Sequence, residues 1–271
     1  MSSPDTAAPA HLPQQFNARM AAHLDRLYAS PQVVAQRQRL RELINAQPGE
    51  RGLDVGCGLA HLSCELALEV GVSGRIIGID ASTDMVAGAT ERAKRLGVAD
   101  RITVQQGDAT ALELPDASVD FAVAVQSYSY VPQVEQAIRE AARVLRPGGR
   151  LAVLETDWDL CIYRSGDDAQ MRRLFDGRWR FAHWTLPREL HRMFRDARLA
   201  LVTAEAYPIV ETRYDPASFG VGLIAVARNA AVRHGVDAAA ADAWVADIHA
   251  RGQDGDYFFC VNRFMFIAVK P

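Results

Sequence analysis

The stretch Leu53-Asp54-Val55-Gly56-Cys57-Gly58 decides the fold of this chain. An aspartate interrupts an apolar run, and two glycines follow at alternate positions. Glycine reaches backbone angles that are closed to other residues and lets a ligand approach the main chain. A helical pattern begins directly afterwards, so a ligand at this turn would lie over free N–H groups at a helix N-terminus. The stretch therefore predicts a ligand-binding strand, turn and helix.

The composition is that of an ordinary globular protein. The chain has 271 residues, of which 49% are hydrophobic and 23% charged, and this length can bury a large core. The formal net charge of -3 argues against broad binding to nucleic acids or anionic membranes, which needs a basic surface. We find no signal peptide and no long apolar run, so we expect a cytoplasmic protein. Its predicted partner is a small-molecule substrate, with neither nucleic acid nor membrane, and a homodimer is one option for its assembly.

The cysteines favour neither a disulfide framework nor a metal site. The chain has four cysteines, and none of them forms a C-x-x-C pair or stands beside a histidine cluster. Isolated buried thiols are the expected state, and no metal site is predicted.

The first half of the chain alternates between strand and helix patterns. Residues 1–13 read as a disordered tail, and residues 14–47 as N-terminal helices with Phe16, Met20, Leu24 and Leu27 at helical spacing. The predicted strands are 51–57, 75–80, 102–107, 119–126 and 150–155. The predicted helices between them are 60–70, 83–96 and 133–145. Such alternation predicts a parallel sheet covered on both faces, with 48–156 as the cofactor-binding core.

The second half departs from strict alternation. Helices are expected over 167–182 and 186–197, the latter with Thr185 as its cap and Pro187 in its first turn. Strands are expected over 200–212 and 257–269, separated by Ala-rich helices in 216–250. We interpret 14–271 as one domain. In it, 157–185 and 213–252 form cap or lid insertions, and 186–212 and 253–271 complete the sheet.

Three aspartates follow three predicted strands. Asp54, Asp80 and Asp108 all lie at carboxyl ends, where open α/β sheets bind ligands. Asp80 follows the second strand, where an acid accepts hydrogen bonds from ribose hydroxyls. Asp108 is suited to accept from an adenine amino group while the next backbone N–H donates to a ring nitrogen. The alternatives are a solvated aspartate at a strand end and a cap or turn residue.

Two classes of nucleoside cofactor are compatible with this pattern. The dinucleotide fingerprint is G-x-G-x-x-G, and this chain has His61 where the third glycine belongs. That substitution weakens a nicotinamide cofactor as an interpretation but leaves it open.

Taken together, the motifs resemble those of class I S-adenosylmethionine-dependent methyltransferases. LDVGCG, GIDAS, QGDAT, FAVAVQS and RVLRPGGRLAVLE occur in the family's order across residues 48–156. The chain is most similar to the small-molecule group that includes the quinone methyltransferases. The resemblance implies a Rossmann-like α/β fold. Its mostly parallel seven-stranded sheet would have helices on both faces, an antiparallel last strand and helical cap insertions. It also implies S-adenosyl-L-methionine as cofactor and methyl transfer to the oxygen, nitrogen or carbon of a small, cyclic or aromatic metabolite.

The resemblance also implies roles for individual residues. Gly56 and Gly58 would lie beneath the methionine part of the cofactor, and Asp54 would hold that loop and the amino group. The other implied cofactor-binding residues are Asp80 and Ala81 at the ribose, Met85 on the adenine face, Asp108 and Ala109 at the adenine edge, and Gln126 near the methionine end. Met85 equally suits plain core. Arg37 is a candidate for the cofactor carboxylate, although we expect it to be an exposed helical arginine.

The acceptor site is less defined by sequence. Methyl transfer from a sulfonium is an in-line displacement in which alignment of the acceptor supplies most of the acceleration, so a catalytic motif is not required. His183 and Asp157 are the candidate catalytic residues, with core packing and helix capping as the respective alternatives. Aromatic residues predicted to line the acceptor pocket, or else to belong to the core, are Tyr128, Tyr130, Trp158, Trp184 and Tyr207.

Other functions stay open at this point. Gln126-Ser127-Tyr128-Ser129 stands where the family's DNA and protein-glutamine methyltransferases carry an N/D-P-P-Y type motif, which disfavours a macromolecular acceptor. A nicotinamide-dependent oxidoreductase on a similar sheet and a non-catalytic cofactor-binding protein are the alternatives, because a fold does not fix a function.

Overall fold

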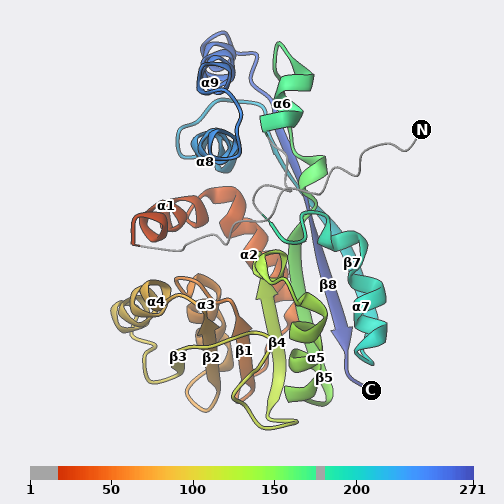
Figure 1. The fold of residues 1–271 in the computed structure, drawn as a ribbon. Helices are drawn as coiled ribbons and strands as arrows, with labels where there is room; N and C mark the ends of the chain where they lie inside the picture. The colour runs from red at the N-terminus through yellow and green to blue at the C-terminus, as the bar shows by residue number, and fades with distance from the viewer. Residues whose placement is uncertain (1–17, 175–180) are drawn as a thin grey trace, which may run out of the picture.

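A computed structural model describes residues 18–174 and 181–271 as a sheet covered by helices on both faces (Figure 1). The strand order is β3-β2-β1-β4-β5-β8-β6, with β7 paired to β8. The strands are β1 Arg51–Val55, β2 Arg75–Asp80, β3 Ile102–Gln106, β4 Val119–Val125, β5 Leu145–Thr156, β6 Ile162–Tyr163, β7 Ala200–Glu211 and β8 Phe259–Val269. Neighbours among β1 to β5 pair in parallel, and β8 runs antiparallel to β5, β6 and β7.

This topology confirms the predicted Rossmann-like sheet with its antiparallel last strand. The two-residue strand β6 raises the number of strands in the described residues to eight, where the sequence predicts seven. The chain progresses outward in opposite directions from β1 and from β4, so the crevice between their carboxyl ends is the topological switch point. Open α/β sheets bind ligands at such a point.

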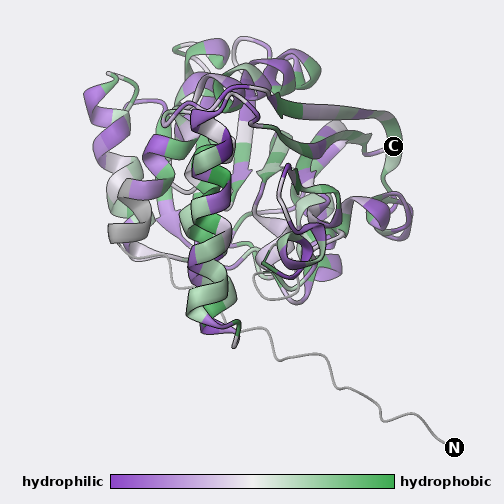
Figure 2. Cartoon of the chain, turned by 90° about the horizontal axis from the view of Figure 1, so that it is seen from above, coloured by the Kyte–Doolittle hydropathy of each residue, from purple (hydrophilic) through white to green (hydrophobic). Residues whose placement is uncertain are grey.

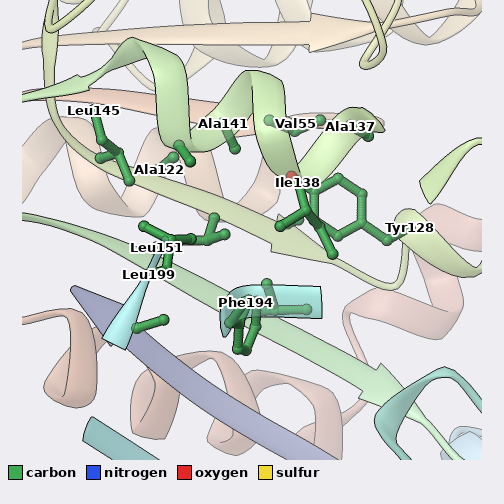
Figure 3. Packing of buried hydrophobic residues seen from close by; sticks show 14 of the residues in the cluster. Val55, Ala122, Tyr128, Ala137, Ile138, Ala141, Leu145, Leu151, Phe194 and Leu199 are labelled. Atoms are coloured by element: carbon green, nitrogen blue, oxygen red, sulfur yellow. The ribbon is translucent and has the colours of Figure 1, made fainter. Parts of the chain in front are cut away.

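Helices form a layer on each face of the sheet (Figure 1). One layer contains α2 Pro31–Ile44, α3 His61–Val70 and α4 Thr83–Arg95, and the opposite layer contains α5 Val134–Val144 and α7 Leu190–Asp196. Ala137, Ile138 and Ala141 of α5 lie beside Leu151 of β5 and Phe194 of α7 (Figure 3). Close packing on both faces fixes the strand ends that carry the site.

The remaining helices gather beyond the carboxyl ends of the strands (Figure 1). They are α1 Ala18–Tyr28, α6 Asp168–Leu174, α8 Phe219–Arg233 and α9 Ala238–Gln253, and their buried residues share one hydrophobic cluster. A Cβ added at Gly222 of α8 would lie 2.8 Å from Leu27 Cδ1 of α1, so the two helices approach closely. The helical insertion predicted over 213–252 therefore exists, and it supports α1.

Some local predictions need correction. The Thr185 side chain makes no capping hydrogen bond, and the segment after it begins as a 3-10 turn, Leu186–Arg188, before α7. The predicted tail 1–13, Phe16 and residues 175–180 of the predicted helix 167–182 lie outside the described residues. All four cysteines are free, as predicted, although only Cys64 and Cys161 are buried.

Seen from above, hydrophilic and hydrophobic residues alternate along the helices (Figure 2). Helix α5 buries Val134, Ala137, Ile138 and Ala141 on one side, as an amphipathic helix packed on a sheet does. None of the helices in 18–174 and 181–271 has the length and apolar character needed to cross a membrane. In the same ranges no group of three His, Cys, Asp or Glu side chains is arranged to hold a metal ion.

Candidate functional site

A cavity of about 810 Å³ lies at the carboxyl ends of β1 to β4 and beneath α1 and α2. Eleven of the residues predicted for the cofactor or the acceptor line it: Asp54, Gly56, Gly58, Asp80, Ala81, Met85, Asp108, Ala109, Gln126, Tyr128 and Tyr130. The structure therefore brings the whole predicted cofactor-binding set together around one cavity, although its members come from five separate loops and helix starts.

The glycine turn after β1 packs closely against Ser127 at Gly56 and faces open space at Gly58. Gly56 has φ +70°, and a Cβ there would lie 2.4 Å from the Cβ of Ser127. Gly58 has φ +53°, and a Cβ there would meet nothing within 4 Å. Both glycines have a positive φ, which other residues rarely adopt, and at Gly58 the backbone also faces open space where a ligand can approach.

Asp80 holds the turn through two backbone hydrogen bonds. Its Oδ2 accepts from the N–H of Gly58 at 2.8 Å, and its Oδ1 accepts from the N–H of Ser82 at 2.9 Å. Burial raises the pKa of Asp80, against the opposing effect of these hydrogen bonds. A carboxylate has about four acceptor positions, so two remain for the hydroxyl groups of a ribose.

Asp108 and Ala109 present an acceptor and a donor to the cavity. Asp108 Oδ1 accepts from the N–H and the hydroxyl of Thr110, both at 2.8 Å. In the described part of the chain, neither Asp108 Oδ2 nor the N–H of Ala109 has a hydrogen-bond partner. An oxygen acceptor beside an N–H donor matches the edge of an adenine base.

Asp54 lies beneath the turn in a buried position. Its Oδ2 accepts from the Ser63 hydroxyl of α3 at 2.6 Å. Burial, and to a smaller extent the Asp80 carboxylate, raises the pKa of Asp54 to about 7 despite this hydrogen bond. Asp54 is therefore poised between its neutral and charged forms near neutral pH, and a cationic amino group in the cavity would favour the charged form.

Glu155 is a structural residue of the site that the sequence analysis does not identify. Its Oε1 accepts from the backbone N–H groups of Ser127, Tyr128 and Ser129, which follow β4. It is fully buried at the end of β5. Burial raises the pKa of Glu155 to about 7, against the opposing hydrogen bonds. Glu155 therefore fixes the loop that carries Tyr128 to the cavity.

Glu155→Gln should change how stability depends on pH. The pKa is 4.5 in the unfolded chain and about 7 in the folded protein, so between these values folding binds a proton, and raising the pH favours unfolding. Glutamine keeps the acceptor without this proton. The unfolding free energy of the variant minus that of the wild type should therefore rise by about 1–3 kcal/mol between about pH 5 and pH 7. Urea unfolding at several pH values measures the difference, and a constant value would contradict the assignment.

Two residues at the α1 and α2 side of the cavity contact α1, and one of them, Arg37, differs from the sequence expectation. Arg37 is buried and lines the cavity, where an exposed position is predicted. Its guanidinium pairs with Glu65 at 3.0 Å and donates to the carbonyl of Tyr28 at 2.6 Å. His61 bonds Asp25 of α1 at 2.8 Å, and burial together with the charges of nearby arginines lowers the pKa of His61 to about 4. The helix α1 is thus tied down over the cavity.

The remaining predicted residues are not among those that line the cavity. The His183 ring nitrogen lies 3.1 Å from the carbonyl of Pro132, and Asp157 pairs with Arg188 at 2.6 Å. Trp158 stacks on Phe181 with ring centroids 4.8 Å apart, and Phe181 contacts Tyr130 at 4.9 Å. Trp184 and Tyr207 pack against the hydrophobic cluster of the cap. Catalytic and acceptor-binding roles for these five residues stay predictions.

The geometry fits the adenosyl cofactor that the resemblance implies. The fit rests on three observations: open space above Gly58, spare acceptor positions on Asp80, and the unpaired acceptor and donor at Asp108 and Ala109. The apolar side chain of Met85 is buried and lines the cavity between them. The third glycine of G-x-G-x-x-G, which a dinucleotide site needs, is absent from the sequence.

Comparison with known proteins agrees with this geometry. A family model described as a methyltransferase domain matches residues 46–198. An uncharacterised 37.1 kDa protein in transposon TN4556 of Streptomyces fradiae is 32% identical over 251 residues, which cover 91% of this chain and 70% of that protein. A 2-phytyl-1,4-naphtoquinone methyltransferase of Synechococcus elongatus is 40% identical over 110 residues, 41% of this chain and 47% of that enzyme. Among solved structures, a geranyl diphosphate methyltransferase shares the fold with a TM-score of 0.57 and 17% identity, over 95% of this chain and 93% of that one.

Proposed function

Because the chain belongs to the class I S-adenosylmethionine-dependent methyltransferases, we propose that it methylates a small, ring-containing metabolite in the cavity beneath α1. The observation that supports this proposal most is the convergence of Asp54, Asp80 and Asp108 on one cavity beside an open glycine turn. The naphthoquinone enzyme named above is matched over less than half its length, so the ring-containing acceptor rests on the cavity and remains a proposal.

Individual residues would hold the cofactor in separable ways. Asp80 accepts from the ribose, Asp108 and Ala109 contact the adenine edge, and the backbone at Gly58 lies under the amino-acid part. When bound, S-adenosylmethionine supplies a methyl group already activated on a sulfonium, and in-line displacement delivers it to the acceptor. The chain's own task is then to align the acceptor and to exclude water.

The acceptor would enter between α1 and the loop after β4. Tyr128 and Tyr130 line this part of the cavity, as do Leu24 and Val33. A general base is needed only when the acceptor must lose a proton. His183 and Asp157 are the sequence-based candidates for that step, and since neither lines the cavity we propose that positioning dominates.

Isothermal titration with S-adenosylmethionine, S-adenosylhomocysteine and NADH tests the proposal. We expect heat from the two adenosyl sulfur compounds and none from NADH. Transfer of a tritiated methyl group to members of a panel of aromatic and cyclic acids, phenols and amines then tests turnover. Binding of NADH without binding of S-adenosylmethionine would replace the proposal with the oxidoreductase alternative.

Two further expectations belong to this proposal. A homodimer is one option for the assembly, which light scattering measures. Cytoplasmic localisation is likewise a prediction, which fractionation of the native host tests.

A further inference from the structure

Arg263 is a buried cation that lines the cavity, and the charge of the Glu155 carboxylate acts on it without forming an ion pair. It is 2% exposed and lines the cavity from β8. Its Nη1 donates to Gln36 Oε1 of α2, and its guanidinium lies over the ring of Phe219 with 4.3 Å between the guanidinium carbon and the ring centroid. In residues 18–174 and 181–271 no carboxylate forms an ion pair with it, and its Nε has no partner.

Gln36 leaves a second unpaired donor at the same place. It is fully buried, lines the cavity, and its Nε2 has no hydrogen-bond partner in the part of the chain that the structure describes. A buried charge and a buried amide that are left unpaired cost folding free energy. Burial lowers the pKa of Arg263 only to about 10, so the side chain stays charged at neutral pH. Both groups are donors, so the partner they lack is an acceptor.

We propose that Arg263 and Gln36 form an anion-binding subsite that recognises a carboxylate or an ionised phenol on the methyl acceptor. This inference rests on the proposed function and adds the chemical class of the acceptor. A guanidinium and a neighbouring N–H match the two oxygens of a carboxylate. The aromatic ring of Phe219 lies against the guanidinium of Arg263 and holds it in place.

The position on the sheet assigns the subsite to the acceptor and not to the cofactor. Arg263 lies on β8 in register with Thr156 of β5. The order β1-β4-β5-β8 separates β8 from β1 by three strand spacings, which is about 14 Å at ~4.8 Å each. The glycine turn follows β1, so β4 and β5 lie between Arg263 and that turn, which leaves the side of the cavity near Arg263 for the acceptor. The apolar residues Val33 and Leu24 of α2 and α1 would cover a ring attached to the anion.

A matched pair of probes tests the subsite. 1-Naphthoate and 1-naphthamide have the same ring and size and differ in charge. Each is titrated against the full chain, with and without saturating S-adenosylhomocysteine. We expect the wild type to bind naphthoate at least about tenfold more tightly than the amide, and Arg263→Gln to reduce this preference below about threefold.

Two further variants keep the test decisive. Gln36→Glu places a carboxylate beside Arg263, which stabilises the buried cation and should abolish the preference in a folded protein. Arg39→Gln removes a half-exposed cation of α2 that pairs with Glu205 and does not line the cavity, so it should leave the preference unchanged.

Three results would overturn the inference. Equal affinity of the wild type for both probes would exclude an anion subsite. If Arg39→Gln lost the preference for naphthoate to the same extent as Arg263→Gln, the preference would come from the overall positive charge and not from a subsite at Arg263. A more than about tenfold loss of S-adenosylhomocysteine affinity in Arg263→Gln would reassign Arg263 to the cofactor. Failure of the wild type to bind any adenosyl compound would instead refute the proposed function. The two failures are distinguishable, because the two probes are also compared in cofactor-free protein.

Discussion

Asp80→Asn is expected to weaken binding of S-adenosylhomocysteine about 100-fold, or about 3 kcal/mol. The carboxylate accepts from the N–H of Gly58 through Oδ2 and from the N–H of Ser82 through Oδ1. An asparagine of the same shape turns one of these oxygens into a donor, which then opposes a backbone N–H and also loses an acceptor for the ribose. Both the turn and the ligand contact are weakened by one atom replacement. Isothermal titration of the purified variant measures the effect.

Asp84→Asn is the matched control for this experiment. Asp84 is exposed in the first turn of α4 and does not line the cavity, although it is only four residues from Asp80. Asp84→Asn removes the same charge as Asp80→Asn but does so outside the cavity, so the Asp84→Asn variant should keep wild-type affinity. An Asp80→Asn protein that unfolds at the wild-type urea concentration and binds the ligand with unchanged affinity would remove Asp80 from the site.

The core of the fold and the cofactor side of the site follow from local sequence. Strand residues alternate or run apolar, and Asp54, Asp80 and Asp108 each end such a run, so a parallel sheet necessarily brings them to one edge. The glycines of this turn are also recognisable from the local sequence. A turn with a φ of +70°, as at Gly56, favours glycine whichever residue lies beside it. These predictions depend on short segments and on one rule of sheet topology.

The acceptor side depends on contacts between distant segments. Gln36 and Arg263 are 227 residues apart in the chain and meet only because α2 packs on β8. A signal is nevertheless present. Arg263 is the charged residue of β8, and period-two alternation places it on the same face as the buried Val261 and Met265. A cation in an apolar row of a buried strand indicates an unusual partner.

The burial of Arg37 could have been predicted from its position in the helix pattern, although its charge suggests exposure. It lies four residues after Val33 and three before Leu40, both buried, so it shares their face of α2. Reading the face instead of the residue type predicts its burial. His183 offers no such guide, since the direction of a loop beside aromatic residues is set by tertiary packing. The cover formed by α1 likewise follows from the contact between Leu27 and Gly222, which no local pattern encodes.

Gly56→Ala is expected to have the largest effect on both stability and binding. The new Cβ would lie 2.4 Å from the Cβ of Ser127, and the position has φ +70°. The loop after β4 would have to move, although its N–H groups are held by Glu155 and the Ser127 hydroxyl donates to the carbonyl of Val55 at 2.8 Å. We expect the unfolding free energy to fall by about 2–4 kcal/mol and S-adenosylhomocysteine affinity to fall more than about 100-fold.

Urea unfolding and calorimetry measure this effect, and a double-mutant cycle separates the contact from the backbone strain. Gly58→Ala has a similar φ of +53° but no atom within 4 Å of its Cβ, so it should lose only about 1 kcal/mol of stability. Ser127→Gly removes the atom that the Gly56→Ala methyl group meets. The double variant should therefore be more stable than the sum of the single changes predicts, by about 1–2 kcal/mol. Additive effects would show that φ alone, and not the approach of the β4 loop, requires glycine at this position.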